Sequence, residues 1–119
     1  MLLRNALMLS LSAASLLLAP ACASHSYYLI RTGTITLRLV DDHSPSMLVG
    51  DSGVSPLNAC GHGAIVSFGP DTRIVYEDGT RADTSALTVG RKVSAFMGDD
   101  GVILESCPPK AYAAKVIVH

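Results

Sequence analysis

Residues 63–119 read GAIVSFGPDTRIVYEDGTRADTSALTVGRKVSAFMGDDGVILESCPPKAYAAKVIVH, and this stretch contains most of the predicted strands. Short apolar and β-branched runs alternate with glycine, proline and aspartate, which is the pattern of strands separated by tight turns. No long segment has the apolar spacing of an amphipathic helix, and only residues 82–87 could form a helical turn. The pattern predicts five short strands, at residues 64–68, 73–76, 91–97, 102–107 and 113–118.

Turn chemistry marks the connections between these strands. Gly69-Pro70-Asp71 separates the first two, since proline presets φ and glycine tolerates positive φ. Gly98-Asp99-Asp100-Gly101 predicts a hairpin loop, and Pro108-Pro109 stops the fourth strand because neither residue can donate to a ladder. Short strands in this rhythm predict an all-β fold, a small five- to six-stranded OB-like barrel whose closure would remove exposed edges.

Two runs in the same stretch carry a resemblance. The first is Leu87-x-Val89-Gly90-x-x-Val93, and the second is Ile103-Leu104-Glu105-Ser106-x-Pro108-x-x-Ala111-x-Ala113. With these runs the chain resembles an uncharacterised family of small bacterial secreted proteins, mostly lipoproteins. The resemblance implies an OB-like barrel with no established activity. Cys107 departs from the family pattern, and residues 24–61 have no counterpart in it.

The segment that precedes the barrel, residues 22–62, is predicted to hold a tether, one or two strands and a long loop. Ile35, Leu37 and Leu39 alternate with other residues in the period of two that indicates a strand within residues 27–40. Residues 41–58 are rich in Asp, Ser, Gly and Pro around the apolar island Met47-Leu48-Val49, and they predict a surface loop around one short strand.

The N-terminus predicts export. Arg4 precedes an apolar run at residues 6–18, and Ala19-Pro20-Ala21 places small residues at a cleavage position. This is the organisation of a secretory signal peptide over residues 1–21, and the run is short for a membrane span. A signal anchor that stays in the membrane is the alternative.

Cys22 follows this segment directly and predicts lipid attachment after cleavage. A lipid would tether the domain to a membrane, most firmly with more than one acyl chain. Ordinary cleavage after Ala21 or Ala23 is the alternative, because Ala19-Pro20-Ala21 differs from the usual bacterial lipoprotein box.

Composition limits the class of partner. A chain of 119 residues has room for one domain. Removal of residues 1–21 leaves eight of the nine basic residues against all ten acidic ones. The mature chain is therefore slightly acidic and poor in aromatic residues, whereas nucleic-acid binders are usually basic.

Three cysteines in an exported chain require an explanation. If Cys22 is lipidated or removed, Cys60 and Cys107 remain, and an oxidising compartment favours a disulfide between them. We expect that bond at the closure of the barrel, where the first and fourth predicted strands would pair antiparallel. The alternatives are two unpaired thiols, or a zinc site built from Cys60, His62, Cys107 and His119, although the spacing of these four residues matches no common zinc finger.

Other reactive residues carry weaker indications. Asp41-Asp42 and Asp99-Asp100 lack the spacing of a calcium loop, and charged turns explain them. Ser67, Ser106 and Glu105 could serve as nucleophile and base, but no nucleophile motif surrounds them. His25 and His43 are expected on exposed segments.

Two hypotheses of function follow. The first is an exported, non-enzymatic binding or accessory protein of the cell envelope, with no cofactor, whose partner is an unknown protein or small molecule. The barrel face or the loop at residues 41–58 would be its contact surface. The second is a metal-binding or metal-sensing envelope protein that uses Cys60, His62 and Cys107.

Overall fold

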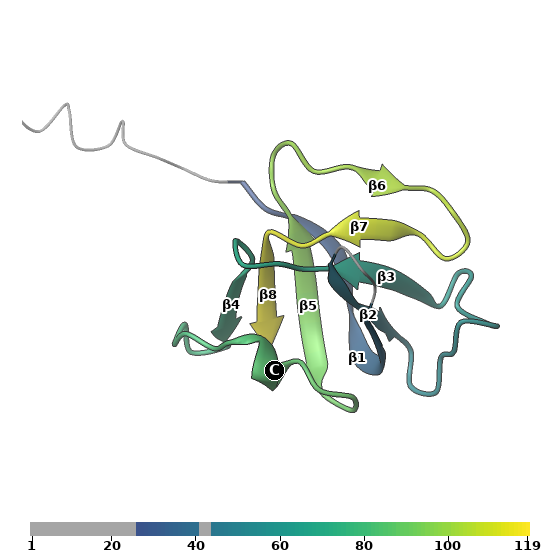
Figure 1. Ribbon diagram of the computed structural model, residues 1–119, viewed down its shortest axis with the longest axis horizontal. Helices are drawn as coiled ribbons and strands as arrows, with labels where there is room; N and C mark the ends of the chain where they lie inside the picture. Colours follow the sequence, from purple (N-terminus) through teal and green to yellow (C-terminus); the bar gives the residue numbers. More distant parts are fainter. Residues whose placement is uncertain (1–25, 41–43) are drawn as a thin grey trace, which may run out of the picture.

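The computed structural model describes residues 26–40 and 44–119. One eight-stranded sheet organises them (Figure 1), and a short 3-10 helix, η2 (Thr84–Ala86), lies between β4 and β5. The strands are β1 (Tyr28–Val40), β2 (Pro45–Gly50), β3 (Gly63–Ser67), β4 (Arg73–Tyr76), β5 (Lys92–Met97), β6 (Ile103–Leu104), β7 (Lys110–Tyr112) and β8 (Lys115–Val118). The chain is all-β, as the sequence predicts.

The predicted signal peptide at residues 1–21 lies outside the described residues. So do Cys22, His25, Asp41-Asp42 and His43. Within the described part of the chain, no helix is long and apolar enough to cross a membrane.

The long strand β1 joins the two halves of the sheet. Its first half, from Tyr28 to Thr34, pairs antiparallel with β5, and its second half, from Thr34 to Val40, pairs antiparallel with β2. The register shifts in both ladders, as at a β-bulge, and such irregularities bend a strand. One strand can therefore belong to two differently oriented parts of the sheet, with β5, β8 and β4 beyond one half and β2, β3, β7 and β6 beyond the other.

The sheet is not closed into a barrel, because its strand order has two ends, β4 and β6. The last strand predicted, at residues 113–118, is confirmed as β8, but a strand that was not predicted, β7, precedes it and is separated from it by Ala113 and Ala114. β7 runs parallel to β3, whereas β8 runs antiparallel to β5. The chain changes partner at the break: the amide of Ala113 donates to Ser67, and that of Ala114 donates to Phe96. The expected five or six strands become eight for this reason and because residues 28–50 supply two full strands.

Buried side chains form two clusters, one on each face of the sheet. Side chains of one parity form the main core, which consists of Ile35, Met47, Val49, Val66, Phe68, Ile74, Leu87, Val93, Ala95, Ala113, Val116 and Val118. A smaller cluster on the other face contains Leu48, Val54 and Ala59. Val54 and Ala59 come from the loop between β2 and β3, so this loop covers the second face of the sheet there.

The apolar island Met47-Leu48-Val49 corrects one expectation of the sequence analysis. A short strand was expected here within a surface loop: the strand is confirmed as β2, but it is not at the surface, since none of the three residues is more than 1% exposed. Met47 and Val49 enter the main core while Leu48 enters the smaller cluster. A strand buried on both faces has no polar alternation, so a short apolar run is the only sign it leaves in the sequence.

Glycine permits the close approach of strands beside this island. A Cβ at Gly50 would lie 2.3 Å from the carbonyl oxygen of His62, and one at Gly33 would lie 2.5 Å from the carbonyl oxygen of Gly50. Real Cβ atoms do not approach backbone atoms so closely. Gly33 and Gly50 are therefore required where β1, β2 and the start of β3 meet.

Candidate functional site

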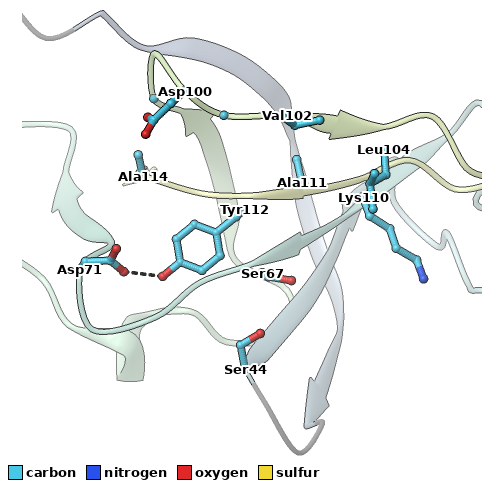
Figure 2. A pocket seen from close by; sticks show the side chains of 12 residues that line it. Ser44, Ser67, Asp71, Asp100, Val102, Leu104, Lys110, Ala111, Tyr112 and Ala114 are labelled. Atoms are coloured by element: carbon cyan, nitrogen blue, oxygen red, sulfur yellow. Dashed lines mark hydrogen bonds between the residues drawn. The ribbon is translucent and has the colours of Figure 1, made fainter.

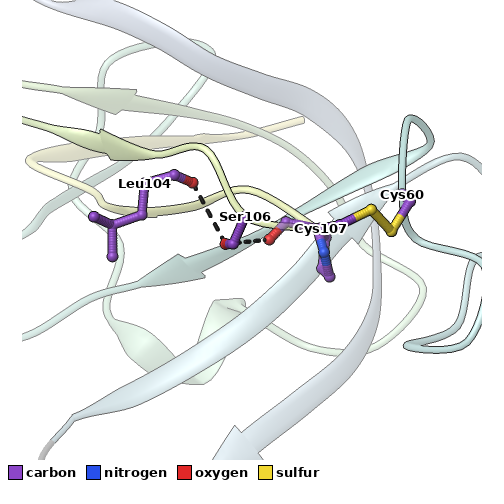
Figure 3. Close-up of a disulfide and its surroundings, with 5 residues drawn as sticks. Cys60, Leu104, Ser106 and Cys107 are labelled. Atoms are coloured by element: carbon purple, nitrogen blue, oxygen red, sulfur yellow. Dashed lines mark hydrogen bonds between the residues drawn. A yellow bond between two sulfur atoms is a disulfide. The ribbon is translucent and has the colours of Figure 1, made fainter.

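Cys60 and Cys107 are joined by a disulfide, with their Cα atoms 4.9 Å apart (Figure 3). The bond was predicted, but the reason given for it was wrong. Cys60 precedes β3 and Cys107 precedes β7, and these two strands run parallel. Because parallel strands begin at the same end of a sheet, the loops that lead into them meet there. The disulfide thus ties the connection between β6 and β7 to the loop that precedes β3.

The alternative zinc ligands are not brought together. The sulfur atoms of Cys60 and Cys107 are bonded to each other, and a metal requires thiolates. His62 lies beside Asp51, with Nδ1 3.3 Å from Oδ2, whereas His119 contacts Ser94 and Glu77. Among residues 26–40 and 44–119, no group of three or more His, Cys, Asp or Glu side chains could hold a metal ion.

The serines considered as nucleophiles take other roles. The Ser106 hydroxyl donates to the carbonyl oxygen of Pro108 at 2.7 Å, which stabilises the turn beside the disulfide (Figure 3). Glu105 is exposed. Ser67, at the end of β3, lines the groove described next.

An open groove of about 720 Å³ lies where β7, the end of β3 and the connection between β5 and β6 meet (Figure 2). Turns with small residues form part of its walls, and polar and apolar side chains line the rest. The residues that line it are Ser44, Ser67, Asp71, Gly98, Asp100, Gly101, Val102, Leu104, Lys110, Ala111, Tyr112 and Ala114. They come from seven separate strands or connections, so only the folded sheet assembles them.

Tyr112 and Asp71 fix one end of the groove. The phenol hydroxyl of Tyr112 donates to the Asp71 carboxylate, and Figure 2 shows this hydrogen bond across the groove. Partial burial raises the pKa of Tyr112 above its ordinary value, and the bond to Asp71 adds to the rise. Tyr112 is thus a neutral donor with a fixed ring, and 42% of the residue remains exposed.

Apolar side chains line the wall of the groove at β6. Val102 is 70% exposed and Leu104 is 60% exposed, although both are large aliphatic residues. Isolated exposed apolar side chains are common, but a group that borders a groove indicates a contact surface. Together with Tyr112, these two residues give the groove an apolar strip.

A second, smaller hollow of about 220 Å³ adjoins the groove and shares Gly98, Asp100 and Ala114 with it. Tyr27 and Asp99 also line this hollow. The ammonium group of Lys115 lies over the Tyr27 ring, 5.1 Å from its centroid. The continuous surface of groove and hollow therefore contains two tyrosines and three carboxylates, those of Asp71, Asp99 and Asp100.

A chain of hydrogen-bonding side chains on the opposite half of the sheet was not predicted. The Glu77 carboxylate contacts Nδ1 of His119, whose Nε2 lies 2.7 Å from the Ser94 hydroxyl. The order carboxylate, imidazole, hydroxyl is that of a hydrolase triad. Ser94, however, is only 7% exposed, and its hydroxyl lies 2.8 Å from that of Thr32.

This polar chain therefore has a structural role. Ser94 stands in the middle of β5, between Thr32 of β1 and Ile117 of β8, and the side chains link three strands and the end of β4. A catalytic serine needs an accessible oxygen and nearby amide donors for an oxyanion, and a ladder position engages its own backbone in strand pairing. No local sequence motif predicts this set of hydrogen-bonded side chains, because only the register of the strands brings them together.

The groove residues were also missed by the sequence analysis. Asp71, Asp99 and Asp100 were explained as charged turn residues, and Lys110 and Tyr112 were assigned no role. Val102 and Leu104 were the only sign of the groove in the sequence. They belong to a predicted strand, yet both are exposed and contribute to no core.

Comparisons with protein-family models, with curated proteins and with solved structures find no match to this chain.

Proposed function

We propose that this protein is an exported, non-enzymatic binding module of the cell envelope, and that the groove bordered by β6 and β7 is its contact surface. The observation that carries the proposal is the gathering of Val102, Leu104 and Tyr112, all substantially exposed, around one groove. Ligand sites are typically concave and largely apolar, with a few polar groups that orient the ligand. Asp71 and Lys110 supply polar groups of that kind here.

Export is supported by the sequence alone. The basic Arg4, the apolar run at residues 6–18 and the small residues at 19–21 have the organisation of a signal peptide. The exposed disulfide-bonded cysteines suit an oxidising compartment outside the cytoplasm.

Membrane attachment through Cys22 forms part of the same proposal. Replacement of Cys22 by alanine should release the mature protein from the membrane fraction, because a cysteine-linked lipid would be its anchor. The full-length protein and the Cys22→Ala variant are compared by fractionation, with intact-mass measurement of the mature chain. A variant that stays in the membrane pellet would remove the lipid from the proposal and leave the groove unaffected.

We further propose that the sheet is a variant of the OB-like barrel, in which β7 and β8 act together as one interrupted closing strand. The parallel β3–β7 ladder and the antiparallel β8–β5 ladder support this arrangement. OB barrels bind ligands with the face near their second and third strands and with the neighbouring loops. Ser44, ahead of β2, and residues 98–102, after β5, border the groove in corresponding places.

The proposed contact surface can be tested without knowledge of the ligand. Amide NMR spectra of the mature protein are recorded with a mixture of small fragments that includes sugars, amino-acid amides and aromatic acids. We expect shifts that cluster at Asp71, Gly101, Leu104 and Tyr112, because fragments bind where apolar area and polar groups converge. Tyr112→Phe, which removes the donor but keeps the ring, is the matched variant. Shifts that cluster elsewhere, or the absence of binding at the groove, would refute the proposed function.

A further inference from the structure

The strand β6 ends the sheet on one side. It pairs with β7 through Ile103 opposite Ala111 and Leu104 opposite Lys110, and it is the last strand in the order. Within the described ranges, its other edge has no strand beside it (Figure 1). The backbone groups of a free edge are a template for the addition of another strand.

The side chains of this edge alternate in the way that an added strand would require. Val102 and Leu104 are two residues apart, so they lie on the same face, and both line the groove. Leu104 pairs with Lys110, and Tyr112 is two residues further along β7 on that face. Alternate side chains of an added strand would therefore meet Val102 and Leu104, the part of the apolar strip that lies at the edge.

Charge is distributed unequally along the groove. Asp71 and Asp100 lie toward one end and Lys110 toward the other, beside Leu104 (Figure 2). The adjoining hollow adds Asp99 at the acidic end, where Lys115 is the basic group and already lies over the Tyr27 ring. The groove thus complements a ligand with a basic group at one end and apolar groups in its middle.

The free edge is also held in place before any ligand arrives. The β7 ladder with β3 holds one side of the β6–β7 hairpin, and the Cys60–Cys107 bond fixes the turn between the two strands. Binding to a surface that is already ordered avoids the entropy cost of ordering it.

We propose that the groove takes an extended peptide segment, which adds as a strand to the free edge of β6. Its alternate apolar side chains lie against Val102 and Leu104, and a basic side chain reaches Asp100. This proposal rests on the proposed function and specifies the ligand class. An oligosaccharide would use the tyrosine and the carboxylates, but it would leave the exposed aliphatic residues and the backbone edge without a role. A second copy of the chain could use the edge, but β6 has no basic residue to offer Asp100.

The first experiment uses the mature protein and a phage-displayed library of short linear peptides. Enriched sequences should alternate apolar and polar residues and should carry Lys or Arg near one end. The enriched peptides are then synthesised with a fluorescent label and titrated by anisotropy. Leu104→Asp should weaken binding roughly tenfold or more, the scale expected for loss of one buried leucine contact.

Val89→Asp is the matched control, since Val89 is 61% exposed and does not line the groove. This variant should bind the peptides as the parent protein does. Asp100→Asn should weaken the peptides that carry Lys or Arg, more at low salt than at high salt, because the contact is an exposed charge pair.

The second experiment separates strand addition from other modes of peptide binding. Each selected peptide is made in two forms, with N-methyl groups on alternate amides in one register or in the other. In an added strand only alternate amides face the edge, so one form should lose binding and the other should keep it. Equal affinity of the two forms would overturn strand addition.

Three further outcomes would overturn the peptide proposal or the proposed function. Failure to enrich peptides, combined with oligosaccharide fragments that shift groove resonances, would overturn the peptide proposal and leave the groove as the binding surface. Concentration-dependent self-association abolished by Leu104→Asp would assign the edge to a second copy of the chain instead. Fragments that ignore the groove altogether would refute the proposed function itself.

Discussion

The centre of the sheet and the β6–β7 hairpin use apolar residues in opposite ways. Ile35, Met47 and Val49, on β1 and β2, are fully buried, whereas every residue from Val102 to Cys107 is exposed. Both regions contain short aliphatic runs of the same kind. The centre uses its aliphatic side chains to stabilise the fold, and the hairpin leaves them available for contact.

Different interactions hold the two regions in place. The centre has long ladders on both sides and contributes to the two clusters of buried side chains. The hairpin is joined to the rest by the β3–β7 ladder and the disulfide, and only Ala111 among residues 110–112 is buried. We infer that global stability comes from the centre, and that the geometry of the groove depends on the tethers of the hairpin.

A substitution at Phe68, the largest fully buried side chain among the described residues, should have the largest effect on stability. Phe68→Ala should lower the free energy of unfolding by about 3–5 kcal/mol, because a buried ring is replaced by a cavity. Leu104→Ala, at a residue 60% exposed, should change it by about 0.5 kcal/mol or less. Urea unfolding of both variants measures the difference. Equal losses would mean that the hairpin belongs to the folding core.

The disulfide provides the second test. Cys60→Ser and Cys107→Ser should each cost about 2–4 kcal/mol, because the bond closes a long loop in the unfolded chain. The sequence separation of its cysteines is 47. The double variant should be no less stable than either single variant, since all three lack the same interaction.

Hydrogen exchange locates the effect of the same variants. Amides of β6 and β7 should exchange faster in the double variant, while those of β1 and β2 keep the protection that global stability allows them. Exchange that accelerates by the same factor in all four strands would contradict the separation between hairpin and centre.

The smallest expected effect concerns acid stability at the turn before β5, outside both regions. Asp83 caps η2, and its carboxylate accepts hydrogen bonds from the side chain and amide of Ser85. The Ser85 hydroxyl in particular lowers the pKa of Asp83 below its ordinary value. A carboxyl with a lowered folded-state pKa stabilises the fold above its unfolded pKa, and this contribution is lost as pH falls through the lowered value.

NMR titration of the Asp83 carboxyl carbon measures the shift directly. In Ser85→Ala the pKa of Asp83 should return toward its ordinary value, because the first cause of the shift is removed. The turn is exposed, so the accompanying change in stability should be small. A pKa that is the same in both proteins would show that the Ser85 hydroxyl does not contribute.

Local patterns predicted several elements because local chemistry forms them. β3, β4 and β5 lie where short apolar runs end at glycine, proline or aspartate turns. The strand within residues 41–58 was harder to interpret. Because β2 is buried on both faces, its sequence lacks the alternation of apolar and polar residues, and the polar turns that flank it are typical of a loop. The strand β7 and the break between it and β8 could not be predicted. They depend on partners elsewhere in the sequence, Ser67 for Ala113 and Phe96 for Ala114.

The all-β class and the turn positions could be predicted from the order of residue types alone, and the Cys60–Cys107 bond was the favoured prediction among alternatives that the sequence left open. The sequence also predicts the signal peptide. Only the tertiary structure decided why Cys60 meets Cys107, where Asp71 meets Tyr112, and that Val102 and Leu104 face a groove. These contacts join segments that are distant in sequence, and strand order and parallel pairing, which no local pattern encodes, bring them together.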